Sequence, residues 1–341
     1  NAIELDVDAL CDGTDVFIAA IMEHIELAGI HSGDSACVIP PQTISNEIKN
    51  NLINYTTKLA KELGVVGLIN LQYAVKDKEV YLLEANPRAS RTVPYVSKTI
   101  DVPIVKVATK LILGQKLKEL NLLHYTEPNF VSVKEVVFPF QKLIGVDPVL
   151  GPEMKSTGEV MAIAGDFANA YYKVQAAANA QLPTRGNVLM WFDGRTNTSA
   201  FLQIAKELFN LGFNIHAHDD VQKLLMWNNV TAVQLSDNYE HIIGAIQSKE
   251  FELLFVLSGL PASNSELAAK IRRAAVDFNV PYITTYEAAL ASLKAMKAAT
   301  RENRSAIFLA KKIPLEFSLE SAEMNIDSLE GYYKNFSAAA E

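Results

Sequence analysis

The stretch from Gln72 to Arg91, which reads Q-Y-A-V-K-D-K-E-V-Y-L-L-E-A-N-P-R-A-S-R, restricts the fold of this chain most strongly. Two runs typical of β-strands, 68–75 and 80–85, flank a polar K-D-K turn. A three-residue loop (77–79) would place Gln72 directly opposite Glu84. The sequence therefore predicts a β-hairpin with this pair on one face.

Oxygen-bearing side chains gather on that face of the predicted hairpin. Glu84 and Asn86 lie two residues apart and point to the same side as Gln72, while the apolar residues between them point away. A carboxylate flanked by amide oxygens suits Mg²⁺ or Mn²⁺. Arg88 and Arg91 follow at once, and arginines beside such a cluster indicate a phosphorylated substrate. The plainer alternative is an ordinary hairpin with a polar exposed end.

The segment E-A-N-P-R-A-S-R-T-V-P (84–94) resembles the metal and phosphate signature of the second ATP-grasp half of carbamoyl phosphate synthetase large subunits. M-E-H-I-E and G-I-H-S-G-D-S, within 22–35, resemble the same family. The resemblance is strong from residue 1 to about residue 158 and weaker beyond. It implies an ATP-grasp C-terminal lobe at 1–183, mainly an antiparallel sheet with helices. A Rossmann-like, methylglyoxal-synthase-like allosteric domain with a tail is implied at 184–341.

The resemblance implies an ATP-dependent ligase that phosphorylates carbamate to carbamoyl phosphate for arginine and pyrimidine biosynthesis. Glu84 would bridge two Mg²⁺ or Mn²⁺ ions, with Gln72 completing one ion and Asn86 the other. Gln72 and Glu84 would thereby also contact the ATP that these ions bind. Arg88 and Arg91 would hold the carbamate or the transferred phosphoryl group, and K⁺ is a further candidate cofactor.

The resemblance also implies sites for adenosine and for an effector. Glu4 would accept hydrogen bonds from ribose, and the loop Ile30-His31-Ser32 would read the adenine edge. A lone histidine beside a glycine is more often structural, which is the alternative for His31 and for His24. The residues that match the family's ornithine site are Glu26, Asp34, Glu135, Tyr282 and Thr284. Unrelated surface acids are the plainer alternative for the first three.

The second half departs from the family at its nucleotide site. H-A-H-D-D (216–220) stands where a loop containing Gly-Thr should bind a phosphate, and its two carboxylates oppose anion binding. V-L-S-G-L (256–260) replaces an Asn-Thr-Thr-like segment, and Arg195 is the candidate substitute for a family lysine. We therefore expect ornithine to be an effector, and UMP or IMP to act weakly or not at all.

A regular alternation of strand-like and helical segments follows the linker 182–186. It predicts a parallel sheet covered by helices. The expected strands are 187–192, 213–217, 230–235, 252–257 and 281–285, and the expected helices are 198–211, 239–248, 263–278 and 286–298. Before the linker, strands are expected at 4–9, 16–25 and 131–140, and helices at 48–63, 103–113 and 167–180.

Composition limits the partners. The net charge is −8 without a block of like charges, which argues against nucleic acid or an anionic membrane. We see no apolar run of the ~18 residues that a membrane helix needs, and no secretory signal. The two cysteines fit a reducing cytoplasm. The chain opens on Asn1 directly in a strand, so we interpret it as a piece of a longer polypeptide. The implied partners are the rest of the large subunit, a glutaminase small subunit through that missing part, and a second copy.

Two other hypotheses compete with a carbamoyl phosphate synthetase large subunit. A biotin carboxylase is another ATP-grasp ligase, but the Gln-Val-Glu-His run of that family is absent here. The chain could instead be a metal- and effector-binding regulatory fragment without turnover. Because ATP-grasp sites lie between two lobes, we expect the isolated chain to be inactive.

Overall fold

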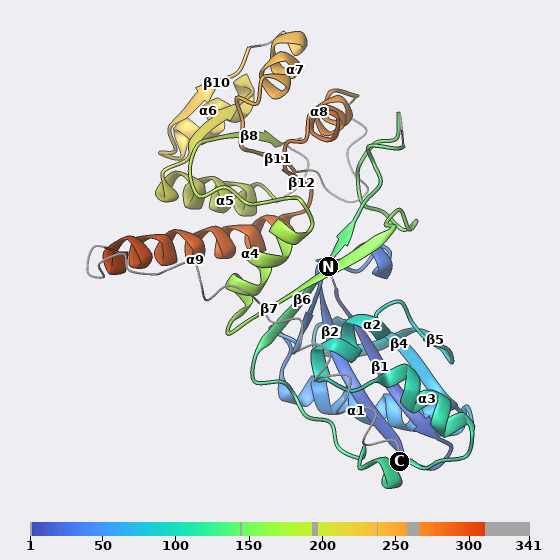
Figure 1. Cartoon of the computed structure of the whole chain (residues 1–341). Coiled ribbons are helices and arrows are strands. Elements are labelled where there is room, and N and C mark those ends of the chain that lie inside the picture. Colours follow the sequence, from blue (N-terminus) through green and yellow to red (C-terminus); the bar gives the residue numbers. More distant parts are fainter. Residues whose placement is uncertain (1, 144, 193–196, 237, 258–265, 311–341) are drawn as a thin grey trace. The chain divides into compact units, whose positions relative to one another are not determined.

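A computed structural model describes the chain except for residues 1, 144, 193–196, 237, 258–265 and 311–341 (Figure 1). It contains a seven-stranded sheet in the order β5-β4-β1-β2-β3-β6-β7 and a five-stranded sheet in the order β10-β9-β8-β11-β12. Both sheets belong to one compact unit, Asn1–Thr300. Among the described residues, we find no helix with the length and apolar character needed to cross a membrane.

All neighbouring strands of the first sheet are antiparallel. Its strands are β1 (Ile3–Asp12), β2 (Val16–Leu27), β3 (Cys37–Ile39), β4 (Val66–Lys76), β5 (Glu79–Asn86), β6 (Val131–Val137) and β7 (Gly158–Ala164). Strand β1 alternates acidic and apolar residues, so its acids lie on one face and Leu5, Val7 and Ala9 on the other. The three apolar side chains are fully buried.

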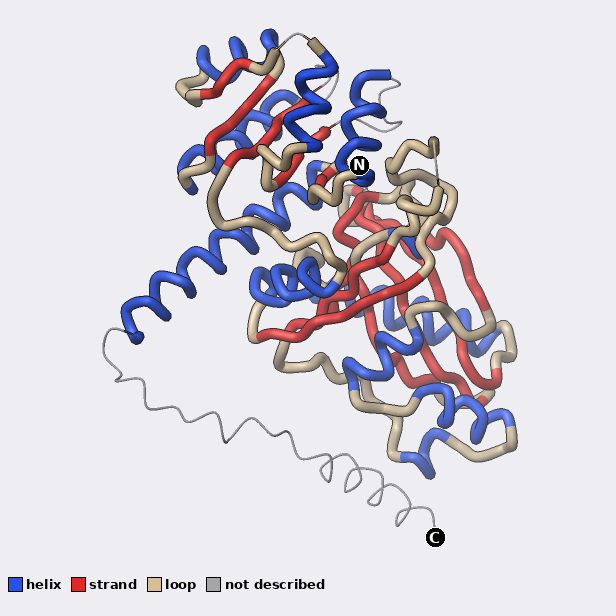
Figure 2. Tube along the Cα trace, turned by 45° about the horizontal axis from the view of Figure 1, so that its top comes forward, coloured by secondary structure: helices blue, strands red, loops and turns tan. Residues whose placement is uncertain are grey.

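Helices pack on both faces of this sheet (Figure 2). Helix α1 (Asn46–Glu62) begins after Ser45, whose hydroxyl accepts from the amide of Ile48, and it packs on the apolar face of β1 and β4. Helices α2 (Val93–Ile100) and α3 (Ile104–Ile112) pack on the opposite side against a separate cluster that contains Leu10 and Met22. Helix α4 (Phe167–Ala177) begins after Asp166, whose side chain accepts from the amide of Asn169. Short 3-10 helices span Ser32–Asp34 and Leu117–Leu120.

The β4–β5 hairpin has the predicted pair in register but reaches it differently. Gln72 pairs with Glu84. The predicted three-residue loop is wrong, because Lys76 pairs with Glu79. The loop therefore contains only Asp77 and Lys78, which both have positive φ, 52° and 70°. A register shift after Gln72 leaves Leu83 as an extra, bulged residue that restores the pairing. Strand β5 is the sheet edge, and its apolar side chains 81–83 are exposed rather than covered.

The second sheet is parallel, as the alternating pattern predicts. Its strands are β8 (Asn187–Phe192), β9 (Asn214–Ala217), β10 (Ala232–Gln234), β11 (Leu253–Leu257) and β12 (Tyr282–Ile283). Its helices are α5 (Thr198–Leu211), α6 (Asp219–Trp227), α7 (Tyr239–Gln247), α8 (Glu266–Asp277) and α9 (Tyr286–Ala310). Helix α6 is the one described helix of this region that the sequence pattern did not predict. It begins at the acidic pair Asp219-Asp220.

A buried ion pair joins α8 to the loop after β6. The Arg272 side chain is fully buried, and its Nε donates to Asp147 Oδ1 at 2.8 Å while Nη2 lies 2.5 Å from Oδ2. The bidentate geometry fixes both partners. The Asp147 side chain keeps 34% of its surface exposed, so water weakens the pair.

We expect Asp147→Ala to lower the free energy of unfolding by about 2 kcal/mol, because it leaves a buried guanidinium unpaired; fully buried pairs lose about 3–5 kcal/mol. Chemical denaturation measures this loss. Asp277→Ala, which removes the ion pair of the more exposed Arg273 on the same helix, is the matched control and should cost below about 1 kcal/mol. Equal losses of unfolding free energy in the two variants would contradict the claim that burial of Arg272 makes its ion pair the more important one.

Candidate functional site

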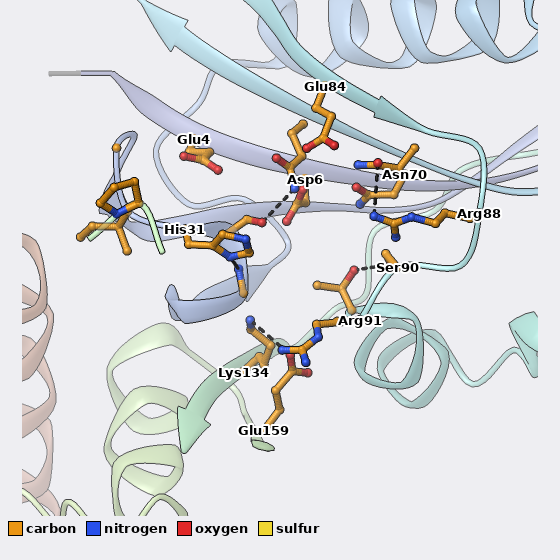
Figure 3. A pocket seen from close by; sticks show the side chains of 18 residues that line it. Glu4, Asp6, His31, Asn70, Glu84, Arg88, Ser90, Arg91, Lys134 and Glu159 are labelled. Atoms are coloured by element: carbon orange, nitrogen blue, oxygen red, sulfur yellow. Dashed lines mark hydrogen bonds and ion pairs between the residues drawn. The ribbon is translucent and has the colours of Figure 1, made fainter. Parts of the chain in front are cut away.

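A cavity of about 380 Å³ lies on the polar face of the first sheet; we call it the polar cavity (Figure 3). It brings together every residue that the sequence suggested for ATP, the metal ions or the carbamate. These are Glu4, Ile30, His31, Ser32, Gln72, Glu84, Asn86, Arg88 and Arg91. They come from β1, from the loop at 29–33, from the β4–β5 hairpin and from the segment after β5.

Directly paired residues project to the same face of a sheet, so the strand register lines up oxygen-bearing side chains in two rows. The rows are Glu84–Gln72–Asp6 and Asn86–Asn70–Asp8. Gln72 donates from its amide nitrogen to the Ser32 hydroxyl at 2.8 Å, so its amide oxygen is the atom left for a cation. In the described part of the chain, no three His, Cys, Asp or Glu side chains converge as a metal site. A metal ion here would therefore rely on Glu84, amide oxygens and the ligand itself.

The arginine loop, residues 87–92, carries two exposed guanidinium groups. Arg88 donates to the amide oxygen of Asn86 at 3.3 Å and to the carbonyl of Ala89 at 3.1 Å. Arg91 contacts the sulfur of Met154 at 2.8 Å. These partners are all neutral, so the positive charge of both side chains remains available to an anion.

Asp8 lies beneath the arginine loop and is 1% exposed. Its carboxylate accepts from Asn70 Nδ2 at 2.9 Å and from Thr92 Oγ1 at 2.6 Å, and Ser90 Oγ lies 2.9 and 3.0 Å from its two oxygens. Burial raises the pKa of Asp8 to about 6, and the hydrogen bonds from Thr92 and Asn70 oppose that rise. The sequence pattern did not single out Asp8.

A buried histidine connects two carboxylates of the polar cavity. His24 Nε2 lies 3.0 Å from Asp6 Oδ2, and its Nδ1 lies 3.8 Å from Glu4 Oε1. Burial alone would lower the pKa of His24, but contacts with Cys37 and Asp6 raise it well above the usual value. His24 therefore has a structural place behind the cavity wall.

Several cavity residues escaped the sequence interpretation, notably Asp6, Asn70 and Lys134. Lys134 is fully buried on β6, with its Nζ 3.9 Å from Glu159. The alternation of acids along β1 was a usable signal for Asp6, but nothing local marks Lys134. Conversely, the His31 ring accepts from the amide of Gly33 at 3.0 Å and so caps its own 3-10 helix, which agrees with the structural alternative.

A second cavity, of about 360 Å³, contains all five residues suggested for an effector; we call it the acidic cavity. Glu26 accepts from the amide of Ala36 at 2.9 Å, and Glu135 accepts from the side chain of Gln175. Asp34 holds the amides of Lys155 and Ser156 at 2.8 and 2.9 Å. The predicted residues that line it are Glu26, Asp34, Glu135, Tyr282 and Thr284.

Two acids of this cavity, Glu26 and Glu135, are held in an unfavourable environment for negative charge. Burial raises the pKa of Glu26 to about 8, and the neighbouring charge of Glu135 adds to the effect. Burial likewise raises the pKa of Glu135. A cation entering the cavity would relieve both penalties.

The region where the family's phosphate loop was expected, 216–220, spans the end of β9 and the start of α6. Asp219 pairs with Lys223 at 2.5 Å, one helical turn later. Both Asp219 and Asp220 occupy the positive end of the helix dipole. Residues 195 and 258–260 lie outside the described residues.

Comparisons with known proteins identify the family. Residues 1–120 match the family model described as carbamoyl-phosphate synthase L chain, ATP binding domain. The carbamoyl phosphate synthase large chain, C-terminal section, of Methanocaldococcus jannaschii is 51% identical over 312 residues, covering 87% of this chain and 50% of that protein. The chain belongs to the carbamoyl phosphate synthase large-chain family. The resemblance seen at residues 84–94 is thereby confirmed, and the biotin carboxylase alternative is excluded.

The carbamoyl phosphate synthase large chain of Archaeoglobus fulgidus is 49% identical over 301 residues, 87% of this chain and 28% of that protein. This chain thus spans half or less of the length of these two relatives. A solved biotin carboxylase domain of a single-chain bacterial carboxylase has a TM-score of 0.43 and 17% identity, covering 67% of this chain and 55% of that chain. The sequence relatives, not this weaker structural likeness, establish the family.

We expect the stability of the chain to decrease as the pH rises from about 5 to 8. The folded-state pKa of Glu26 is raised from 4.5 to about 8, so its protonation stabilises the fold below pH 4.5 and this contribution is lost as the pH rises through about 8. Melting temperatures of wild type and Glu26→Gln, recorded across this range, measure the effect.

Glu26→Gln should flatten the pH profile and melt higher than wild type at pH 8. The groups that face Glu26 are Glu135, His24 and Tyr171, and Asp34 lines the same cavity, so the double variant with Glu135→Gln should flatten it further. The exposed Glu62 on α1 provides the control variant Glu62→Gln. Parallel profiles for wild type and Glu26→Gln would contradict the burial argument.

Proposed function

We propose that this chain supplies the C-terminal lobe of an ATP site that phosphorylates carbamate to carbamoyl phosphate. The polar cavity supports this most directly, because the Glu84 carboxylate and amide oxygens of the sheet face line it together with two unneutralised arginines of the arginine loop. Family membership supports the same reaction class. The lobe would cooperate with the part of the large chain that this sequence does not span.

The polar cavity has the donor set for Mg²⁺ or Mn²⁺. Glu84 would bridge two ions, with the amide oxygens of Gln72 and Asn86 as further ligands, and K⁺ remains a further candidate. Such ions, when bound with ATP, neutralise phosphate charge during transfer. Glu4 would accept hydrogen bonds from the ribose, and the backbone at 30–32 would read the adenine. Arg88 and Arg91 would bind the carbamate or phosphoryl oxygens.

We further propose that residues 1–183 form the ATP-grasp lobe and 184–341 a methylglyoxal-synthase-like allosteric domain. The change from an antiparallel to a parallel sheet across the linker supports this division. The partners would be the remainder of the large chain and, through it, a glutaminase subunit. The site would serve arginine and pyrimidine biosynthesis in the cytoplasm, and the isolated chain would lack turnover.

The acidic cavity would take an ornithine-type effector. Two buried acids with raised pKa values favour an ammonium group, and Tyr282 and Thr284 line the same cavity. The acidic first turn of α6 opposes a nucleotide phosphate in the second domain.

We expect Glu84→Ala, made in the full-length enzyme, to abolish carbamate phosphorylation while bicarbonate-dependent ATP hydrolysis at the other half persists. The variant removes the shared carboxylate and leaves phosphate charge uncompensated. Separate assays of the two partial reactions test this. Glu79→Ala, on the same strand but outside the polar cavity, is the matched control and should keep both activities. Phosphorylation by Glu84→Ala within tenfold of wild type, about 1.4 kcal/mol of barrier, would refute the metal role.

The effector proposal predicts different responses to two ligands. In calorimetric titrations of the intact enzyme, ornithine should bind and UMP should bind weakly or not at all. Glu135→Ala should weaken ornithine binding at least tenfold, because it removes one of the two acids that face the ammonium. UMP binding in the micromolar range that is unchanged by Asp219→Ala would place a phosphate site elsewhere. An unchanged ornithine response in Glu135→Ala would remove the acidic cavity from the proposal.

A further inference from the structure

The arginine loop is attached to the sheet by hydroxyl groups rather than by apolar packing. Ser90 and Thr92 both reach Asp8 on β1, more than 80 residues away in the sequence, and their hydroxyls lie 2.8 Å from each other. Asn70 on β4 donates to the same carboxylate. One buried group therefore joins β1, β4 and the loop.

Thr92 immediately precedes α2, where a threonine hydroxyl usually accepts a hydrogen bond from the first helical turn. Here the Thr92 side chain makes no such cap and donates to Asp8 at 2.6 Å instead. The side chain that could have stabilised the helix end therefore binds the loop to β1. This use of Thr92 indicates that the position of the loop is specified.

The two arginines of the loop have no comparable attachment. Arg88 and Arg91 are exposed, and their contacts are to Asn86, Ala89 and Met154. The amide of Arg88 donates to the carbonyl of Asn86 at 2.8 Å, which fixes only the start of the loop. The far end depends on Ser90 and Thr92.

We propose that Asp8 is a positioning residue, which anchors Ser90 and Thr92 so that Arg88 and Arg91 are held at the polar cavity. The catalytic consequence rests on the proposed function, because it requires these arginines to bind the reacting anion. The anchor itself does not.

The chemistry of a carboxylate suits this task. An ionised carboxylate is acceptor-only and can accept from Asn70, Ser90 and Thr92 together. Asparagine offers one acceptor oxygen, and its amide hydrogens would meet the donor group of Asn70. Asp8→Asn should therefore release part of the loop, although the asparagine side chain has nearly the same shape as aspartate.

The test compares Asp8→Asn, Ser90→Ala, Thr92→Val and Thr92→Ser with wild type. Thr92→Val keeps the shape and removes the hydroxyl, whereas Thr92→Ser keeps the hydroxyl. Asp12→Asn is the matched control, because Asp12 is a buried carboxylate on the same strand that accepts from the amides of Thr14, Asp15 and Leu117 outside the polar cavity.

Amide hydrogen exchange over residues 88–92 of the ligand-free chain measures the anchor. We expect at least tenfold faster exchange in Asp8→Asn and Thr92→Val, and little change in Thr92→Ser. In Asp12→Asn, exchange at residues 88–92 should rise only as much as the global loss of stability requires. In the full-length enzyme with its partner subunit, kcat for carbamate phosphorylation should fall about 30-fold in the first two variants. The KM for ATP should stay within threefold.

Unchanged exchange in both Asp8→Asn and Thr92→Val would overturn the proposal, as would an equal loss of kcat in Asp12→Asn. If Asp8→Asn fails to fold, Ser90→Ala and Thr92→Val decide the outcome. If exchange responds as expected but the wild-type enzyme does not phosphorylate carbamate, the proposed function fails while the anchor stands.

Discussion

The two-sided character of β1 is the constraint on which the first sheet and its cavity depend. Every second residue is apolar and packs with α1. Of the acids between them, Glu4 and Asp6 line the polar cavity, and Asp8 lies beneath the arginine loop. Because side chains alternate strictly along a strand, a shift of one residue would exchange the two faces. The apolar face therefore fixes the register that brings Asp6 beside Gln72 and Asp8 beside Asn70. Packing on one side positions polar groups on the other.

Asp12 and the pair Glu26 and Glu135 are buried carboxylates of two classes with different chemistry. Asp12 is surrounded by donors: burial opposes its charge, but the amides of Asp15, Leu117 and Thr14 lower its pKa. Glu26 and Glu135 have fewer donors, and burial together with their mutual repulsion raises the pKa of Glu26. The first class stabilises the fold without a ligand. The second class lowers the stability of the fold as the pH rises, because the folded protein resists the ionisation of these acids.

The sequence predicted those features whose signals are local. The βα alternation after residue 186 gave the parallel sheet, and the polar pattern of the hairpin gave the Gln72–Glu84 pair. Neither Lys134 nor Asn70 could be found in this way, because their places depend on which strands become neighbours. The two-residue loop was also hidden, since positive φ at both turn residues is usually signalled by Asn-Gly, whereas this loop is Asp-Lys. Helix α6 was missed because its acidic start was interpreted only as an altered anion loop.

The bulge at Leu83 has a consequence for changes in chain length. A two-residue loop with one bulged residue and a three-residue loop without a bulge both bring Gln72 opposite Glu84. A one-residue insertion at the tip could thus be absorbed by straightening the strand at Leu83, and the paired residues near the cavity would not move. Length variation at the exposed tip is thereby uncoupled from the row Glu84–Gln72–Asp6. The edge strand can vary in length while its functional end stays in register.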